Sequence, residues 1–218
     1  INQFSKSKSS TKKKFKLELS DIKLKNFRHF RDRRETGVRE YYYVQDGSVK
    51  VEQMNFPANY ILLNSVNLKG PAVLISHDPN VIPPESKAIL DSVYSCNNPF
   101  VIFIKKANLE KGYFAFDRTG NVVFEEQGKD HVDFKHFSVD EIEGSLSNFF
   151  YSDFESNGVL HELKARLNNK MRIQSFKAGK IDVSNNKTTL ENFTLETDRS
   201  FVGDSLYLTY GSYKDFKN

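Results

Sequence analysis

The chain has 218 residues, with 32 Lys and Arg against 28 Asp and Glu, five His and a single Cys. One cysteine excludes an intramolecular disulfide framework, and no apolar run approaches the roughly 18 residues of a transmembrane helix. The length suits one large domain with appendages. Because the chain has 19 Phe, 10 Tyr and no Trp, and aromatic residues favour strands, we expect a sheet-rich fold.

Positive charge is concentrated in the first 34 residues. This stretch holds 12 Lys and Arg and 3 Asp and Glu, a net charge of 12 − 3 = +9, whereas the whole chain is +4. The remaining 184 residues therefore carry +4 − 9 = −5. A basic arm on a mildly acidic body predicts an arm that binds a polyanion.

The beginning of the chain divides into an arm and a first strand region. Residues 1–14 are rich in Lys and Ser and offer little apolar surface to bury, which predicts a disordered arm. Between Phe15 and Phe30, apolar residues at Phe15, Leu17 and Leu19 alternate with polar ones. This period of two predicts one or two strands.

Turn signals divide the following residues into short strands. Asp46-Gly47 lies between two β-prone runs and predicts a hairpin, since this pair tolerates the backbone of a primed turn. Apolar strands are expected at Tyr60–Val66 and Ala72–Ser76, with a turn at Lys69-Gly70-Pro71 between them. A second hairpin is expected across Arg118–Asn121.

Helices are predicted in three places. Prolines and an acid open one helix, which covers about 83–94. A capping box at Ser138-Val139-Asp140-Glu141 starts a second helix that continues through Phe150. Leucines three and four residues apart give a third helix, over about Gly158–Leu167, one apolar face.

Strands complete the predicted fold. Phe100–Ile104 reads as a buried strand, and the chain from Met171 onward returns to β character. We therefore predict a β-rich α+β domain over residues 15–218, with a mostly antiparallel sheet and two or three helices. A jelly roll is one arrangement that such a sheet can take, and residues 1–14 form the disordered basic arm.

Basic and aromatic side chains interleave in the first strand region, around Phe27-Arg28-His29-Phe30-Arg31-Asp32-Arg33-Arg34. Cations supply affinity for phosphate, and aromatic rings stack on unpaired bases. In a strand, Arg28 and Phe30 share one face, and Phe27, His29 and Arg31 share the other. The residues expected to contact phosphate are Lys12, Lys13, Lys14, Lys16, Arg28, Arg31, Arg33 and Arg34, and those expected to stack are Phe27 and Phe30.

Catalytic motifs of recognised spacing are absent from the sequence. Asp117 with His161-Glu162-Leu163-Lys164 leaves a metal-dependent nuclease open, in which two acids and a Lys hold Mg²⁺ around a phosphodiester. The predicted helical setting of Glu162 and Lys164 speaks against it. His131 and His136 lie five residues apart and match no zinc spacing. We predict no catalytic residue, no metal site and no cofactor.

One segment resembles a known group of proteins. Gly70–Asn80, a polar loop at Pro83–Lys87, a short helix and Asn98-Pro99-Phe100 resemble the centre of jelly-roll capsid proteins of small plant RNA viruses. The segment is also similar to the thirty-kilodalton plant-virus movement proteins. The resemblance implies a jelly roll, a basic arm that gathers the genome, and a structural role for Asp78. The predicted helices after Ser138 depart from that pattern, and a strand–helix–strand crossover in a mixed sheet fits the same residues.

These observations favour non-enzymatic binding of single-stranded nucleic acid, in a viral capsid or movement role, within the host cytoplasm or the virion. The sequence leaves RNA and DNA equally open. The alternative is a protein-interaction module, such as an inhibitor, immunity protein or adaptor, since Tyr41-Tyr42-Tyr43 is typical of an interface. A homo-oligomer is a further option, and no transmembrane segment is expected.

Overall fold

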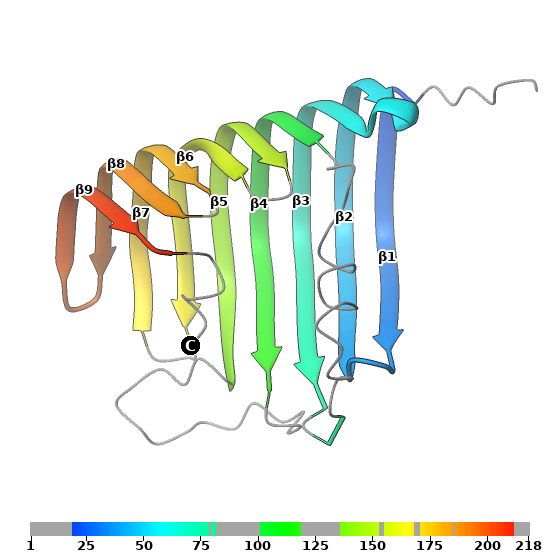
Figure 1. Cartoon of the computed structure of the whole chain (residues 1–218), viewed down its shortest axis with the longest axis horizontal. Helices are drawn as coiled ribbons and strands as arrows, with labels where there is room; N and C mark the ends of the chain where they lie inside the picture. Colours follow the sequence, from blue (N-terminus) through cyan, green and yellow to red (C-terminus); the bar gives the residue numbers. More distant parts are fainter. Residues whose placement is uncertain are drawn as a thin grey trace, which may run out of the picture.

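The computed structural model describes residues 19–78, 80–81, 101–118, 136–152, 155–167, 171–184 and 186–211, and these form one nine-stranded sheet (Figure 1). One 3-10 turn, η1 (Phe56–Ala58), follows the second strand, with the Asn55 side chain accepting a hydrogen bond from the Ala58 amide. The strands are β1 (Asp21–Arg33), β2 (Val38–Asn55), β3 (Tyr60–His77), β4 (Val101–Asp117), β5 (His136–Ser152), β6 (Glu155–Leu167), β7 (Met171–Val183), β8 (Lys187–Thr197) and β9 (Phe201–Thr209).

The strands lie in the sheet in the order in which they occur along the chain. All neighbours are antiparallel except β3 and β4, which are parallel. A parallel pair requires the chain to cross from one end of the sheet to the other. The mixed sheet that was the alternative to a jelly roll is therefore present, with β3 and β4 as its parallel pair. The helix predicted between these two strands lies outside the described residues.

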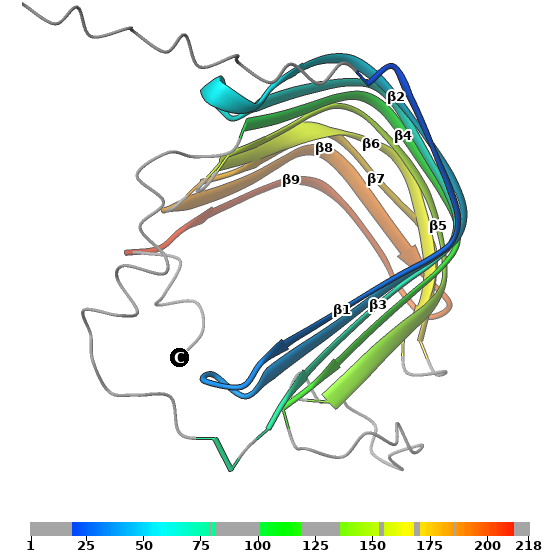
Figure 2. The ribbon, with the colours of Figure 1, turned by 90° about the vertical axis from the view of Figure 1, so that its right-hand side faces the viewer.

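The sheet is strongly bent, so that it has one concave and one convex face (Figure 2). Single residues in the left-handed backbone region interrupt the long strands, among them Asn26, Gly70, Lys111, Glu141 and Asn148, with φ between 49° and 57°. A left-handed residue inside a strand turns its direction and places two consecutive side chains on the same outer face. Such residues bend the strands that they interrupt.

The prediction of two helices between Ser138 and Leu167 is wrong. Residues 138–150 lie in β5 and residues 158–167 lie in β6. In β5, the left-handed residues Glu141 and Asn148 each shift the alternation by one position. Apolar residues on one face of this bent strand are therefore three or four residues apart, which is also the spacing of a helix face. The fold is consequently a single sheet and not the predicted α+β domain.

Two predicted turns are also strand interior. Asp46-Gly47 lies within β2, where Gly47 pairs with Leu24 on one side and Leu68 on the other. Lys69-Gly70-Pro71 lies within β3, where Gly70 has a φ of 57° and contributes to the bend. Both glycines therefore lie within curved strands, and neither lies in a turn that reverses the chain.

Other predicted strands are present. β1 covers much of the region from Phe15 to Phe30, β4 includes most of Phe100–Ile104, and β7 to β9 follow Met171. The arm at 1–14, the helix at about 83–94 and most of the hairpin at 118–121 lie outside the described residues. A jelly roll packs two sheets against each other, whereas the described residues form one. None of the helical segments in this part of the chain has the length and apolar character that a membrane crossing requires.

Candidate apolar trough

A row of apolar residues crosses all nine strands at one level of the sheet. Residues paired directly on neighbouring strands point to the same face. The strands are about 4.8 Å apart, so a row over nine strands spans roughly 38 Å. The row, called the long row below, consists of Leu24, Gly47, Leu68, Leu109, Gly144, Leu163, Phe176, Leu195 and Val202.

A second apolar row runs beside the long row, two or three residues away along each strand. It ends at Asp204 on the edge strand β9. Its apolar members, from β1 to β8, are Ile22, Val49, Val66, Ala107, Leu146, Leu160, Ala178 and Phe193. Before that edge strand, neither row contains a charged or hydrogen-bonding side chain.

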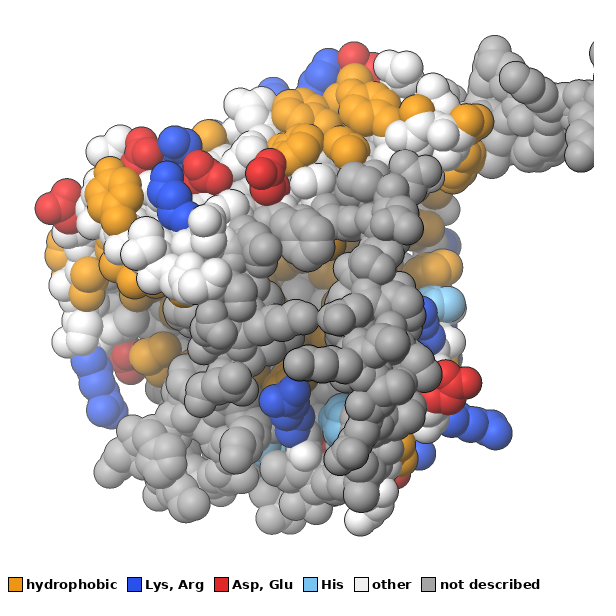
Figure 3. All heavy atoms as spheres, viewed as in Figure 1, with side chains coloured by type: hydrophobic (Ala, Val, Ile, Leu, Met, Phe, Trp, Pro, Cys, Tyr) orange, Lys and Arg blue, Asp and Glu red, His pale blue; other side chains and the backbone are white. Residues whose placement is uncertain are grey.

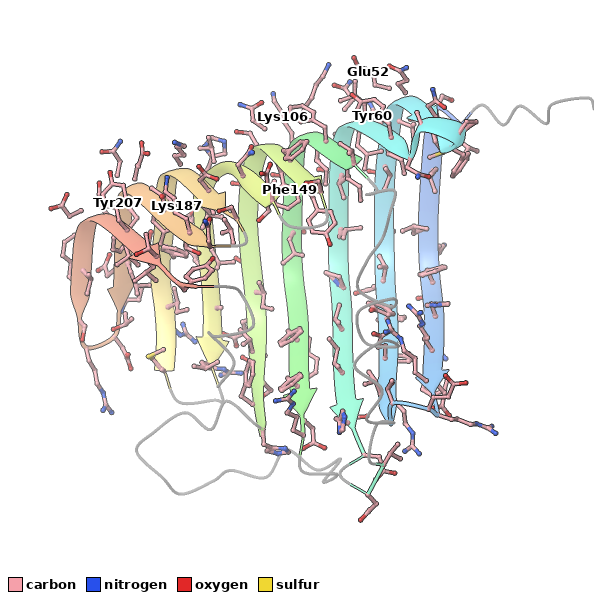
Figure 4. All side chains as sticks on the ribbon, viewed as in Figure 1. Glu52, Tyr60, Lys106, Phe149, Lys187 and Tyr207 are labelled. Atoms are coloured by element: carbon pink, nitrogen blue, oxygen red, sulfur yellow. The ribbon has the colours of Figure 1, made fainter. Side chains whose placement is uncertain are left out.

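Both rows lie on the concave face. A Cβ atom on Gly47 would lie 3.2 Å from Cγ1 of Val44 and 3.1 Å from Cδ2 of Leu68. Val44 and Gly47 are three residues apart, and side chains at that spacing converge in a strand only on the inner side of a bend. Figure 4 shows Phe149, which pairs with Ile104, pointing into the hollow, whereas Lys106 points away from it. We call this concave surface the apolar trough.

The trough continues toward the other end of the strands. A Cβ on Gly112 would lie 2.8 Å from Cδ2 of Leu109, so Gly112 and Leu109 share the concave face. Phe114 is two residues further along β4, and its ring centroid lies 5.8 Å from that of Phe137. A third row at the level of Phe114 contains His29, Tyr42, Val73, Phe114, Val139, Leu167 and Met171.

The convex face is polar at the same level. Asn108 donates a hydrogen bond of 2.8 Å from Nδ2 to Oδ1 of Asn67, and Asn67 donates one of 3.4 Å to Oγ of Ser48. Ser145 pairs with Asn108 and extends this ladder to β5. Glu52 and Lys106 also point outward (Figure 4). At this level of the sheet, apolar residues thus lie on the concave face and polar residues on the convex face. The convex face is the one suited to contact with water.

A second packed layer that buries the trough does not exist among the described residues. Their fully buried hydrophobic residues are three alanines, Ala115, Ala165 and Ala178. The larger apolar side chains of the trough remain half-buried or exposed. Figure 3 shows hydrophobic side chains gathered along the upper margin of this face, over β2 to β4. A contiguous apolar surface that is only partly buried is typical of an interaction site.

Charged residues lie at one end of the trough, beside the last residues of β1. Arg33 donates a hydrogen bond of 3.1 Å from Nη2 to Oε1 of Glu40, and Nη1 of Arg31 lies 3.8 Å from Oε2 of the same carboxylate. The Glu40 side chain is 11% exposed, so two arginines compensate one largely buried acid. Immediately after β4, the Arg118 guanidinium lies over the Phe116 ring, 5.9 Å from its centroid.

The structure separates the residues predicted to bind nucleic acid. Phe27, Arg31 and Arg33 lie on the concave face, whereas Arg28 and Phe30 lie on the convex face, as a strand requires. The Arg28 guanidinium lies 5.7 Å from the centre of the Tyr43 ring, and Phe30 is 60% exposed. Arg34 follows the end of β1, with Nε 3.7 Å from Asp32. The four predicted lysines, Lys12, Lys13, Lys14 and Lys16, lie outside the described residues.

The nuclease candidates do not converge. Glu162 and Lys164 lie on the strand β6, with Nζ and Oε2 3.6 Å apart, and not on the predicted helix. Asp117 pairs with His136, whereas Glu162 pairs with Ser145, which is nine positions further along β5. His131 lies outside the described residues. Within the described part of the chain, no three His, Cys, Asp or Glu side chains are grouped as metal ligands.

Tyr113 on β4 lies in a polar group in which the structure raises its pKa. Burial raises the pKa of Tyr113 above its ordinary value of 10.0, and the nearby Asp140 carboxylate raises this pKa further. A hydrogen bond with Ser138 acts in the opposite direction. Since Asp140 also accepts hydrogen bonds from Arg166 at 2.9 and 3.2 Å, this polar group belongs to the convex face and takes no part in the trough.

The trough was not among the sites predicted from the sequence. A usable signal was present, because apolar residues at spacings of two, interrupted by single spacings of three, mark a strand that bends. Ile102, Ile104, Ala107, Leu109, Gly112, Phe114 and Phe116 follow this pattern through β4. No protein-family model and no curated protein sequence matches the chain.

Proposed function

We propose that this protein binds lipid acyl chains along its apolar trough. The observation that carries the proposal is the long row from Leu24 to Val202, which crosses nine strands without a polar side chain. The row runs across the strands and therefore along the length of the sheet. A flexible apolar chain lying in this direction contacts one strand after another.

An acyl chain suits this surface better than a protein segment does. A peptide backbone brings N–H and C=O groups that lose free energy when they are buried without hydrogen-bond partners. The long row and its neighbour offer no such partners before Asp204. An acyl chain has no polar group, and each buried CH₂ contributes about 0.8 kcal/mol. Ten methylenes in the trough would therefore contribute about 8 kcal/mol before the cost of ordering the chain.

Two consecutive residues of β4 allow a matched test of the proposal. Leu109 belongs to the long row, whereas Asn108 belongs to the polar ladder on the opposite face. The purified protein and the variants Leu109→Glu and Asn108→Glu are incubated with vesicles that contain labelled phosphatidylcholine, and the lipid that stays with the reisolated protein is measured. We expect Leu109→Glu to reduce bound lipid at least tenfold and Asn108→Glu to leave it within twofold.

Circular dichroism and thermal unfolding show whether each variant keeps its sheet. Leu109→Met conserves the size and apolar character of the side chain and should retain lipid. The absence of lipid from the wild-type protein, or an equal loss in both glutamate variants, would refute acyl-chain binding in the trough.

Single-stranded nucleic-acid binding is the second candidate function. It is favoured by the exposed cationic and aromatic side chains on the convex side of β1, where Arg28 and Phe30 are accessible. This surface is independent of the trough, so one protein can carry both activities. Binding of a labelled oligonucleotide that weakens steeply with salt and is reduced in Arg28→Gln would support it. Binding that does not change with salt would contradict it.

A further inference from the structure

The concave face changes from apolar to charged side chains at the end of the sheet where β1 ends. Arg33, Val38 and His77 are paired across β1, β2 and β3. Asp117 pairs with Ser76, so the next residue, Arg118, stands beside β3 at the level of His77. Arg31 lies two residues inside Arg33, at the level of Glu40. The last two levels of the trough therefore present the arginines together with Glu40, whereas the long row and the second row, toward the start of β1, are apolar.

Among the described residues, the acids that share this face do not balance the positive charge at this end. Arg31, Arg33 and Arg118 carry three positive charges and Glu40 carries one negative charge, which leaves 3 − 1 = +2 with His77 neutral. Asp78 follows His77, and its carboxylate accepts hydrogen bonds from the Asn80 amide and side chain within its own turn. We call Arg31, Arg33, His77 and Arg118 the cationic end of the trough.

Several donors at the cationic end remain available for a ligand. The side chains of Arg31 and Arg33 are 55% and 36% exposed, and Arg118 is exposed. A guanidinium group has five N–H donors in a planar fork that matches the oxygen atoms of a phosphate. Phe116 holds the Arg118 guanidinium against its ring, beside the apolar rows.

We propose that the cationic end selects lipids whose headgroup is an anionic phosphate. This inference rests on the proposed binding of acyl chains. The rows of the trough follow one another along the strands toward the arginines, so a chain that turns from the long row along the strands brings its end group to the cationic end. The change from apolar to cationic levels along one face reproduces the polarity of such a lipid. A neutral lipid of equal chain length gains the apolar contacts alone.

The experiment compares lipids that share the same acyl chains and differ in their headgroup. Phosphatidic acid carries an anionic phosphate, phosphatidylcholine a zwitterionic headgroup and diacylglycerol a hydroxyl. Binding of each lipid is measured with wild-type protein, with Arg31→Gln/Arg118→Gln and with Arg28→Gln/Arg39→Gln. The last variant loses the same charge from the convex face. Arg33 is left intact because it compensates the largely buried Glu40.

We expect wild-type protein to bind phosphatidic acid at least tenfold more tightly than diacylglycerol, a difference that corresponds to about 1.4 kcal/mol. This ratio should fall at least threefold in Arg31→Gln/Arg118→Gln and stay within twofold in the control variant. Added salt should also reduce the ratio of the two affinities in wild-type protein, because salt screens exposed charges. Inorganic phosphate at the same concentration should neither bind detectably nor displace diacylglycerol.

The outcomes separate this inference from the proposed function. Equal binding of all three lipids would overturn the headgroup selection and leave acyl-chain binding standing. Binding of inorganic phosphate alone as tight as that of phosphatidic acid would assign the arginines to a free anion and overturn the lipid source. Failure of every lipid to bind would overturn both proposals.

Discussion

Asn108 and Leu109 are consecutive residues of β4 that take part in two different surfaces. Asn108 donates a hydrogen bond of 2.8 Å to Asn67 on the convex face, and Leu109 lies between Leu68 and Gly144 on the concave face. The alternation of a strand thus produces a hydrogen-bonded polar ladder and an apolar row from the same residues. Within the described residues, a single sheet with these two faces leaves its apolar side without a second packed layer.

The trough should bind lipid along its full length. Leu195 on β8 belongs to the long row, and we expect Leu195→Asp to reduce bound acyl chains, even though β8 lies four strands from Leu109 on β4. Thr194→Asp places the same charge on the opposite face and should have little effect. Native mass spectrometry measures the lipid bound by each variant. Equal occupancy in Leu195→Asp and wild type would restrict the site to the strands before β8.

Gly144 should be intolerant of any side chain. A Cβ at this position would lie 2.9 Å from the Glu162 carbonyl oxygen, which belongs to the backbone of β6 and has little freedom to move. We expect Gly144→Ala to lower the free energy of unfolding by about 1–3 kcal/mol. Gly158→Ala is the matched control, because its nearest atom would be 3.3 Å away. Urea denaturation measures both variants, and an equal effect would show that β6 shifts to accommodate the methyl group.

Glu40 should matter more for stability than the exposed acids of the sheet. Its side chain is 11% exposed and accepts a hydrogen bond from Arg33, so Glu40→Gln leaves a partly buried cation without its charge partner. We expect a loss of about 1–2 kcal/mol in the free energy of unfolding, given that Arg33 is partly screened by solvent. Glu52→Gln removes an exposed ion pair with Lys105 and should cost no more than about 0.5 kcal/mol. Similar losses in the two variants would argue against a structural role of Glu40.

Stability should fall at alkaline pH, in part through Tyr113. Burial and the Asp140 carboxylate raise the pKa of Tyr113 in the folded protein above 10.0, its value in the unfolded chain. The folded state therefore holds the phenol proton more tightly, and this contribution is complete below about pH 10 and is lost as the pH rises through the folded pKa. Tyr113→Phe has no proton to lose, so its free energy of unfolding should decline less steeply above pH 10. Parallel curves for the two proteins would assign the alkaline loss to other groups.

The sequence was sufficient to predict β structure wherever strands run straight. Alternation between Phe15 and Phe30 predicted most of β1, and the β character after Met171 predicted β7 to β9, because side chains alternate strictly in a straight strand. The charge at the start of the chain was likewise evident from composition. These features depend on residues that are close together in the chain.

The tertiary structure decided where the strands bend and what the apolar residues form together. Val139, Ile142, Leu146 and Phe149 are three or four residues apart and suggest a helix, but left-handed residues at Glu141 and Asn148 place them on one face of a strand. Asp46-Gly47 suggests a turn, yet Gly47 continues a strand because it pairs with Leu24 on one side and Leu68 on the other. The trough itself exists only through pairing across nine strands. A local pattern specifies which residues are apolar, whereas cross-strand register decides that they form one continuous concave surface.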